Sequence, residues 1–211
     1  MSTSLVYRSA AGYELLMRVL YGGHYSERMR AVADQVPDGA SVLELCCGPG
    51  TMYLRHLRGR AGSYVGIDVN QRFVERLRRR GAAARRLDLT VDDTALPSAD
   101  VVILQASLYH FLPDAEGILD RMLAAAGEKV IVSEPVRNLA SSRLPLVGRI
   151  GRRAADPGVG GHAQRFTEAS LGDLMGRYRE RVLRSFPIPG GREVVYVLAA
   201  SADRSRTTAG P

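Results

Sequence analysis

The sequence predicts an α/β fold, a doubly wound and mostly parallel sheet, from three observations. Strand-like and helix-like stretches alternate from residue 41 onward, which is typical of βαβ units. Short apolar runs such as VVIL and VIV suit strands that are covered on both faces. Two strand-like runs near the end, joined by Pro-Gly-Gly, predict an antiparallel hairpin. The 211 residues, 45% of them hydrophobic, are enough for one globular domain.

The predicted elements follow in order along the chain. Strands are expected at residues 41–46, 63–68, 83–88, 100–105 and 128–134, and in two further runs within "RVLRSFPIPGGREVVYVLAA". Helices are expected at residues 50–60, 70–80 and 114–126, and in "FTEASLGDLMGRY". Apolar residues recur at helical spacing in these stretches, and Thr167 is a suitable N-cap for the last one.

Both ends of the chain carry additions to this sheet. Residues 10–36 look helical, and a stripe recurs there at every fourth position: Tyr13, Met17, Tyr21, Tyr25 and Met29. This stripe either packs on the sheet or forms a lid over a ligand. We expect an N-terminal helical cap at 1–40, a main domain at 41–201 with a covering insertion at 135–165, and a disordered tail at 202–211.

The net charge of +7 raises the question of a nucleic-acid partner. The densest basic cluster comprises Arg72, Arg76, Arg78, Arg79, Arg80, Arg85 and Arg86. Lys129 is the only lysine, and an excess of Arg with abundant Ala and Gly is expected from a GC-rich genome. We interpret the cluster as a solvated helix face, so nucleic acid is disfavoured as a partner.

The two cysteines, Cys46 and Cys47, are neighbours and do not form a disulfide framework. A reducing compartment is therefore expected. Arg8 and Arg18 interrupt the apolar residues near the N-terminus, unlike a signal peptide, and no run approaches transmembrane length. The sequence predicts a cytoplasmic protein without a membrane partner, and it leaves the oligomeric state open.

The stretch "SVLELCCGPG" ends a strand in a turn that carries Gly48 and Gly50. Such a turn lets the backbone approach a ligand closely. A dinucleotide fingerprint would need a third glycine where Tyr53 stands, which disfavours a nicotinamide oxidoreductase. The next strand ends in "GIDVN", where Asp68 can accept hydrogen bonds from both hydroxyls of a ribose. The ligand is therefore expected to contain a nucleoside.

Together, "VLELCCGPG" and "GIDVN" resemble the first two motifs of class I S-adenosylmethionine-dependent methyltransferases. Cys46 stands where the family's acid-x-Gly-x-Gly-x-Gly pattern has its first glycine. The resemblance implies a Rossmann-like, seven-stranded sheet in the order 3-2-1-4-5-7-6 with its last strand antiparallel. It also implies S-adenosyl-L-methionine as cofactor and methyl transfer as the activity.

The resemblance further implies which residues bind the cofactor. They are Tyr25, Glu44, Cys46, Gly48, Gly50, Asp68, Val69, Asp88, Leu89, Gln105 and Ala106. The loop would line the methionine and ribose, with Glu44 fixing it, while Asp68 binds the ribose diol. Val69 and Leu89 would flank the adenine, and Gln105 and Ala106 would lie under the sulfonium. Asp88 would receive the adenine amino group, or it caps its own loop.

Catalytic candidates follow the fourth and fifth strands. His110 is the first choice of base, with Tyr109 beside it and Glu134 at the end of the fifth strand, although His110 and Glu134 could instead only shape the pocket. Four further residues are candidate substrate contacts: Tyr21, His24, His162 and Arg165. No spacing among the histidines and cysteines resembles a zinc site, so no metal is expected.

The acceptor is expected to be a small molecule. The sequence "QASLYHF" lacks the Asn/Asp-Pro-Pro-aromatic signature of enzymes that methylate nucleobase amines. A covering region lined by Tyr and Met suits an aromatic or apolar secondary metabolite. Two alternatives stay open: an RNA methyltransferase, and a cofactor-binding partner protein or rearrangement catalyst that transfers no methyl group.

Overall fold

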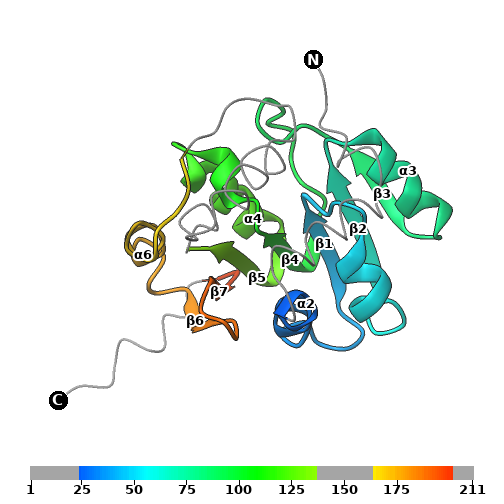
Figure 1. Ribbon diagram of the computed structural model, residues 1–211. Helices are drawn as coiled ribbons and strands as arrows, with labels where there is room; N and C mark the ends of the chain where they lie inside the picture. Colours follow the sequence, from blue (N-terminus) through cyan, green and yellow to red (C-terminus); the bar gives the residue numbers. More distant parts are fainter. Residues whose placement is uncertain (1–23, 137–163, 202–211) are drawn as a thin grey trace, which may run out of the picture.

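The computed structural model describes residues 24–136 and 164–201, and these form a seven-stranded sheet in the order β3-β2-β1-β4-β5-β7-β6 (Figure 1). The strands are β1 (Ser41–Leu45), β2 (Ser63–Asp68), β3 (Ala83–Arg86), β4 (Ala99–Gln105), β5 (Ala126–Pro135), β6 (Val182–Pro187) and β7 (Glu193–Ala199). The first five are parallel, and β7 runs antiparallel to both of its neighbours. The predicted sheet order and antiparallel last strand are confirmed.

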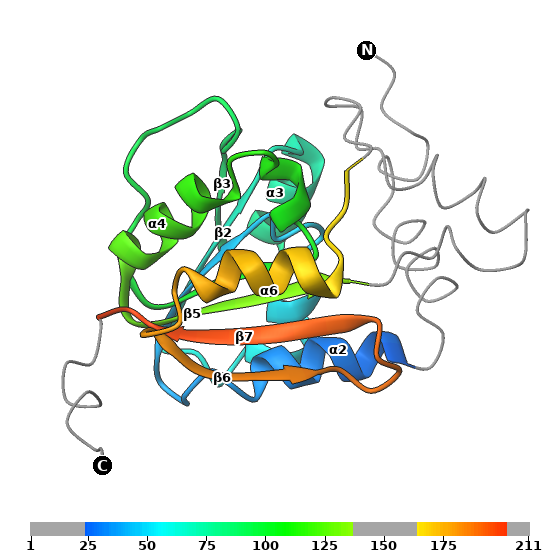
Figure 2. The ribbon, with the colours of Figure 1, turned by 90° about the vertical axis from the view of Figure 1, so that its left-hand side faces the viewer.

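Helices cover both faces of the sheet, as a doubly wound fold requires (Figure 2). They are α2 (His24–Ala33), η2 (Tyr53–Leu57), α3 (Gln71–Arg79), η3 (Leu108–Phe111), α4 (Ala115–Ala125) and α6 (Glu168–Gly176). One apolar layer joins α2, η2 and α3 to the sheet, and the other joins η3, α4 and α6 to its opposite face. Alternate residues along the central strands serve the two layers, which explains their continuous apolar runs.

Two of the differences between the observed and the predicted element bounds have a local cause. The helix expected at 50–60 is one α-turn followed by the π-helix η2, which closes when the Arg58 N–H donates to the Tyr53 carbonyl at 2.8 Å. Strand β3 ends at Arg86, because Asp88 forms a turn with Thr90. The N-cap at Thr167 is confirmed, with its hydroxyl oxygen accepting from the Ser170 N–H at 3.1 Å.

A buried ion pair joins helix α2 to strand β7. The Arg28 guanidinium donates from Nε to Glu193 Oε2 at 2.7 Å and from Nη2 to Oε1 at 2.9 Å. The Ser133 hydroxyl donates to the same Oε1 at 2.6 Å. Both charged side chains are almost fully buried, at 3% and 2% exposed. Helix α2 is therefore docked by charge as well as by apolar packing.

Several predictions fall outside the described residues. Residues 1–23, residues 137–163 of the insertion predicted at 135–165, and the tail at 202–211 lie there, as do Tyr21 and His162. Within α2, Tyr25 and Met29 of the stripe that recurs at every fourth position are buried in the core, as the packing interpretation expects. In the part of the chain that the structure describes, no helix is long and apolar enough to cross a membrane.

Candidate active site

The loop after β1 begins with a residue in the left-handed conformation. Cys46 has φ 51°, and Ala106, which follows the neighbouring strand β4, has φ 51° as well. Leu45 and Leu104 are paired in the sheet, so these residues stand at adjacent strand ends. Non-glycine residues in this conformation cost roughly 1–3 kcal/mol each and concentrate at functional sites. The geometry marks the carboxyl edge of β1 and β4 as the candidate site.

The two glycines of the loop serve different purposes. A Cβ added to Gly50, at φ 76°, would lie 2.1 Å from Leu77 Cδ2 and 2.7 Å from Leu77 Cγ. Leu77 is fully buried, so it has no room to move. A Cβ at Gly48, at φ 57°, would meet nothing within 4 Å. Gly50 therefore lets the loop pack on α3, whereas Gly48 borders open space.

This contrast predicts unequal effects of two alanine substitutions. Gly50→Ala is expected to lower the free energy of unfolding by about 2–5 kcal/mol, from overpacking and a left-handed Cβ. Gly48→Ala is the matched control. It should lower the free energy of unfolding by only about 1–2 kcal/mol, which is the cost of a Cβ in the left-handed conformation. Urea unfolding of both variants checks this, and equal losses would contradict the packing role of Gly50.

Asp68 ends β2 beside this loop and holds it through the backbone. The Gly48 and Asn70 N–H groups donate to Asp68 Oδ2 and Oδ1, each at 2.8 Å. Burial raises the pKa of Asp68 to about 6, although these two hydrogen bonds lower it. The carboxylate is thus ionised at neutral pH. Each oxygen keeps a further acceptor position, which fits the two hydroxyls of a ribose.

Glu44 is hydrogen-bonded to the neighbouring strand β2. Its Oε2 accepts a hydrogen bond from the Tyr64 hydroxyl at 2.6 Å, and the Tyr64 ring stacks on Tyr53 at 4.1 Å. Burial raises the pKa of Glu44 to about 8. Among the described residues, its hydrogen bond goes to β2 and not to the loop. Asp68 holds the loop directly at Gly48, and the role expected of Glu44 at the cofactor loop stays a prediction.

The residues expected around the adenine lie at the ends of β2 and β3. Asp88 Oδ1 accepts from the Thr90 N–H at 3.1 Å and from its hydroxyl at 2.6 Å. The loop-capping interpretation of Asp88 is thus realised, and its contact with adenine stays a prediction. Leu89 is buried and Val69 is half-buried, and the Val69 carbonyl accepts from Arg86 Nε at 3.2 Å.

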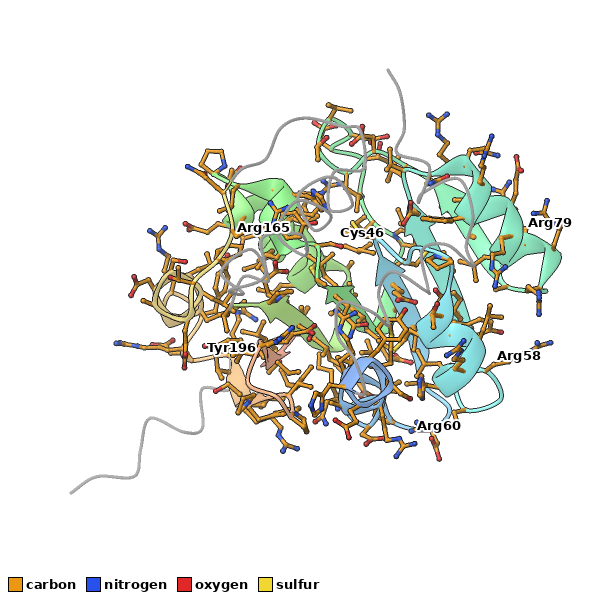
Figure 3. All side chains as sticks on the ribbon, in the orientation of Figure 1. Cys46, Arg58, Arg60, Arg79, Arg165 and Tyr196 are labelled. Atoms are coloured by element: carbon orange, nitrogen blue, oxygen red, sulfur yellow. The ribbon has the colours of Figure 1, made fainter. Side chains whose placement is uncertain are left out.

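The catalytic candidates gather beyond the ends of β4 and β5. The Arg165 guanidinium lies 3.8 Å above the Tyr109 ring, and the Tyr109 and His110 ring centroids are 4.0 Å apart. Glu134 is fully buried, and its Oε2 accepts from the Leu108 N–H at 2.9 Å at the start of η3. Burial raises the pKa of Glu134 to about 8. Figure 3 shows Arg165 and Cys46 in the central part of the molecule, away from Arg58, Arg60 and Arg79 at its periphery.

The remaining candidates have structural contacts. Gln105 Nε2 donates to the Arg28 carbonyl at 3.3 Å, and the Ala106 N–H donates to the Ser133 carbonyl at 2.6 Å. His24 Nδ1 lies 2.6 Å from Glu27 Oε2, and its ring lies against Gly190 in the β6–β7 turn. The substrate contact proposed for His24 therefore stays a prediction.

Sequence reasoning missed the Arg28–Glu193 pair beside this site. A usable signal was the position of Arg28 three residues after Tyr25, next to the apolar stripe of α2. Within residues 24–136 and 164–201, no group of three or more His, Cys, Asp or Glu side chains could hold a metal ion. The expectation of a metal-free site stays a prediction.

The sheet order, the glycine loop and the acid after β2 define the class of Rossmann-like, S-adenosylmethionine-dependent class I methyltransferases. Residues 21–178 match the family model described as "Methyltransferase domain". This match covers more than half of the chain, so the chain belongs to that methyltransferase family. No curated protein matches it. S-adenosylmethionine is the cofactor of the family.

Solved structures share the fold at low sequence identity. Magnesium protoporphyrin IX methyltransferase from Synechocystis PCC 6803, with bound SAH, is 17% identical with a TM-score of 0.63, over 92% of this chain and 97% of that one. A possible histamine N-methyltransferase from Thermotoga maritima is 18% identical with a TM-score of 0.64, over 93% and 98%. A chain from the complex of the Haloferax volcanii Trm112 methyltransferase activator with a methyltransferase is 15% identical with a TM-score of 0.67, over 95% and 99%.

Proposed function

We propose that this enzyme transfers the methyl group of S-adenosylmethionine to a small aromatic or apolar metabolite. The observation that carries the proposal is the stack of Arg165, Tyr109 and His110 beyond β4 and β5. Aromatic faces next to a few polar groups are typical of small-molecule sites. The similar structures include enzymes named for a porphyrin and, as a possible activity, for histamine, which supports an acceptor of this size.

The residues at the carboxyl edge fit the cofactor. Asp68 has acceptor positions for a ribose diol, and the open space beside Gly48 leaves room for a ligand against the loop. Gln105 ends β4 next to it, and Ala106 follows. When bound, the cofactor supplies a methyl group on a positively charged sulfur. The protein's task is to align an acceptor with that group and to exclude water.

A nucleic-acid acceptor is the competing proposal, because of the arginines on α3 and β3. Two of these arginines are already used within the fold: Arg78 Nε donates to the Ala84 carbonyl at 2.9 Å, and Arg86 Nε donates to the Val69 carbonyl. These bonds support the interpretation as a structural and solvated face. Because a methyltransferase from a Trm112 complex shares the fold, we include RNA among the acceptors to be tested.

Calorimetry and a methyl-transfer assay test the proposal together. Titration with S-adenosylmethionine and with NAD should show binding of the first alone. Labelled cofactor should then methylate members of a panel of phenols, aromatic amines, thiols and hydroxy acids, and leave bulk RNA unlabelled. Transfer to RNA, with binding that weakens steeply as salt rises, would overturn the small-molecule proposal. Cofactor binding without transfer to any acceptor would favour the alternative in which this protein binds the cofactor but transfers no methyl group.

His110→Ala is expected to lower the methyl-transfer rate by about 10- to 100-fold, because a small displacement of an aligned acceptor has effects of that size. The imidazole packs on Tyr109, so its loss should loosen the wall of the acceptor site. Affinity for S-adenosylmethionine should stay unchanged in calorimetry. His56→Ala, on η2, is the matched control and should change neither quantity. Full activity of His110→Ala would show that His110 does not contribute to the acceptor site.

A further inference from the structure

We propose that Glu134 Oε1 is the base that removes the proton from a hydroxyl of the acceptor, so that the acceptor is a phenol or enol and the product is its methyl ether. This inference rests on the proposed methyl transfer to a small molecule. It selects one residue from the three catalytic candidates, and it specifies oxygen as the atom of the small-molecule acceptor that receives the methyl group.

The two oxygens of Glu134 have different environments. Oε2 is held by the Leu108 N–H at 2.9 Å, which fixes the carboxyl group at the start of η3. Oε1 is buried and has no hydrogen-bond partner among the described residues. A buried carboxylate oxygen without a donor is costly, and folded proteins rarely keep one without a reason. A donor supplied by a ligand would satisfy this oxygen.

Groups on three other elements interact electrostatically with the carboxyl group of Glu134. They are Cys46 in the loop after β1, Glu193 at the start of β7, and Arg165 just before α6. The first belongs to the cofactor loop, and the third stacks on Tyr109 in the proposed acceptor wall. Glu134 is therefore coupled electrostatically to the loop that would hold the methyl donor and to the wall that would hold an aromatic acceptor.

The protonation chemistry of Glu134 matches an acidic hydroxyl. Burial and the nearby Glu193 raise the pKa of Glu134, while the backbone N–H groups of Leu108 and Tyr109 and the charge of Arg165 lower it, with a result of about 8. A phenol has a pKa of about 10, so transfer of its proton to this carboxylate is only mildly uphill. A hydroxyl as weakly acidic as water, with a pKa of about 15.7, is poorly matched.

The step balances in atoms and charge. The O–H bond of the acceptor breaks and its proton moves to Glu134 Oε1, which becomes neutral. The acceptor oxygen forms a bond to the methyl group, and the electron pair of the broken carbon–sulfur bond stays on sulfur. One positive charge is lost from sulfur and one negative charge from the carboxylate, so no further reactant is needed.

Glu134→Gln tests the proposal, because an amide keeps the acceptor for the Leu108 N–H and cannot act as the base. The expected rate with a phenolic acceptor falls by about 10²–10⁴-fold, with unchanged affinity for S-adenosylmethionine. The ionisation near pH 8 should disappear from the pH–rate profile. Glu128→Gln, exposed near the amino end of the same strand, is the matched control and should behave as wild type.

A second measurement needs neither cofactor nor acceptor. The folded-state pKa of Glu134 lies above its ordinary value of 4.5, so the protonated carboxyl stabilises the native state fully below about pH 4.5. This contribution should decrease as the pH rises to about 8 and then level off. Glu134→Gln should lack this dependence. The difference in melting temperature between wild type and variant, measured from pH 5 to 9, should therefore change in that direction.

The outcomes separate the two proposals. Transfer to amines or thiols but not phenols, or a Glu134→Gln variant with the wild-type rate and pH profile, would overturn the role of Glu134 and leave methyl transfer standing. A pH-independent difference in melting temperature would also overturn it, since Glu134 would then titrate like an exposed carboxyl. Failure of the wild type to methylate any acceptor class would overturn the proposed function and this inference with it.

Discussion

Asp68→Ala is expected to remove most of the affinity for S-adenosylmethionine. The carboxylate would accept hydrogen bonds from two ribose hydroxyls, and hydrogen bonds to a charged group are worth about 1.5–3 kcal/mol each. Their loss corresponds to a dissociation constant about 10²–10⁴-fold higher. The loop should loosen as well, because the Gly48 N–H loses its acceptor. Calorimetric titration of the variant with S-adenosylmethionine measures the effect.

The control for this substitution is Asp93→Ala, an exposed aspartate in the segment between β3 and β4. It should bind the cofactor as the wild type does. Thermal unfolding of Asp68→Ala establishes whether the variant is folded. Wild-type affinity in a folded Asp68→Ala variant would show that the ribose binds elsewhere, and the assignment of the loop would fail with it.

Glu193→Ala is expected to lower the free energy of unfolding by about 3–5 kcal/mol, because it leaves Arg28 as a buried charge without its counterion. The Ser133 hydroxyl would lose its acceptor at the same time. For a chain of this size, such a loss lowers the melting temperature by on the order of 10 °C. Urea unfolding and thermal unfolding both report it.

The chain offers a matched control in a second ion pair of equal length. Arg60 Nε lies 2.7 Å from Asp38 Oδ1, as Arg28 Nε does from Glu193 Oε2, but its side chains are 39% and 78% exposed. Asp38→Ala should therefore lose less than about 1 kcal/mol. If Glu193→Ala does not fold, the double variant Arg28→Met/Glu193→Leu, which buries no charge, should recover the fold. Equal losses of unfolding free energy in Asp38→Ala and Glu193→Ala would contradict the argument that burial makes the Arg28–Glu193 pair the more costly one to break.

Local signals in the sequence predicted much of the fold and part of the site. Asp68 was found because it is the last residue of a strand-like run, and the carboxyl end of a parallel strand is where ligands bind. Thr167 was found because a threonine before a helical pattern supplies the acceptor that the first N–H groups lack. Both inferences need only neighbouring residues, so no knowledge of the tertiary structure was required.

The contacts that the sequence did not predict join distant parts of the chain. Arg28 and Glu193 are 165 residues apart, and each alone is typical of a solvated surface charge. The sequence drew attention to Tyr53 only because it stands in place of a third glycine, and it did not predict that Tyr53 stacks on Tyr64 of β2. The environment of Glu134, with one carboxyl oxygen bonded to Leu108 and the other without a partner among the described residues, depends on η3 packing beside β5. Such pairings are set by the assembled core and carry no local pattern.

The pairing of Arg28 with Glu193 also bears on how the protein is made. A ribosome adds about 5–20 residues per second, so Glu193 leaves it roughly 10–30 s after Arg28, at the separation of 165 residues. During that interval β1 to β3 and α3 can assemble from neighbouring residues, while α2 has no counterion to dock against. The nascent chain can thus assemble its nucleoside-binding half first, and the ion pair that fixes α2 can form only when strand β7 has been made.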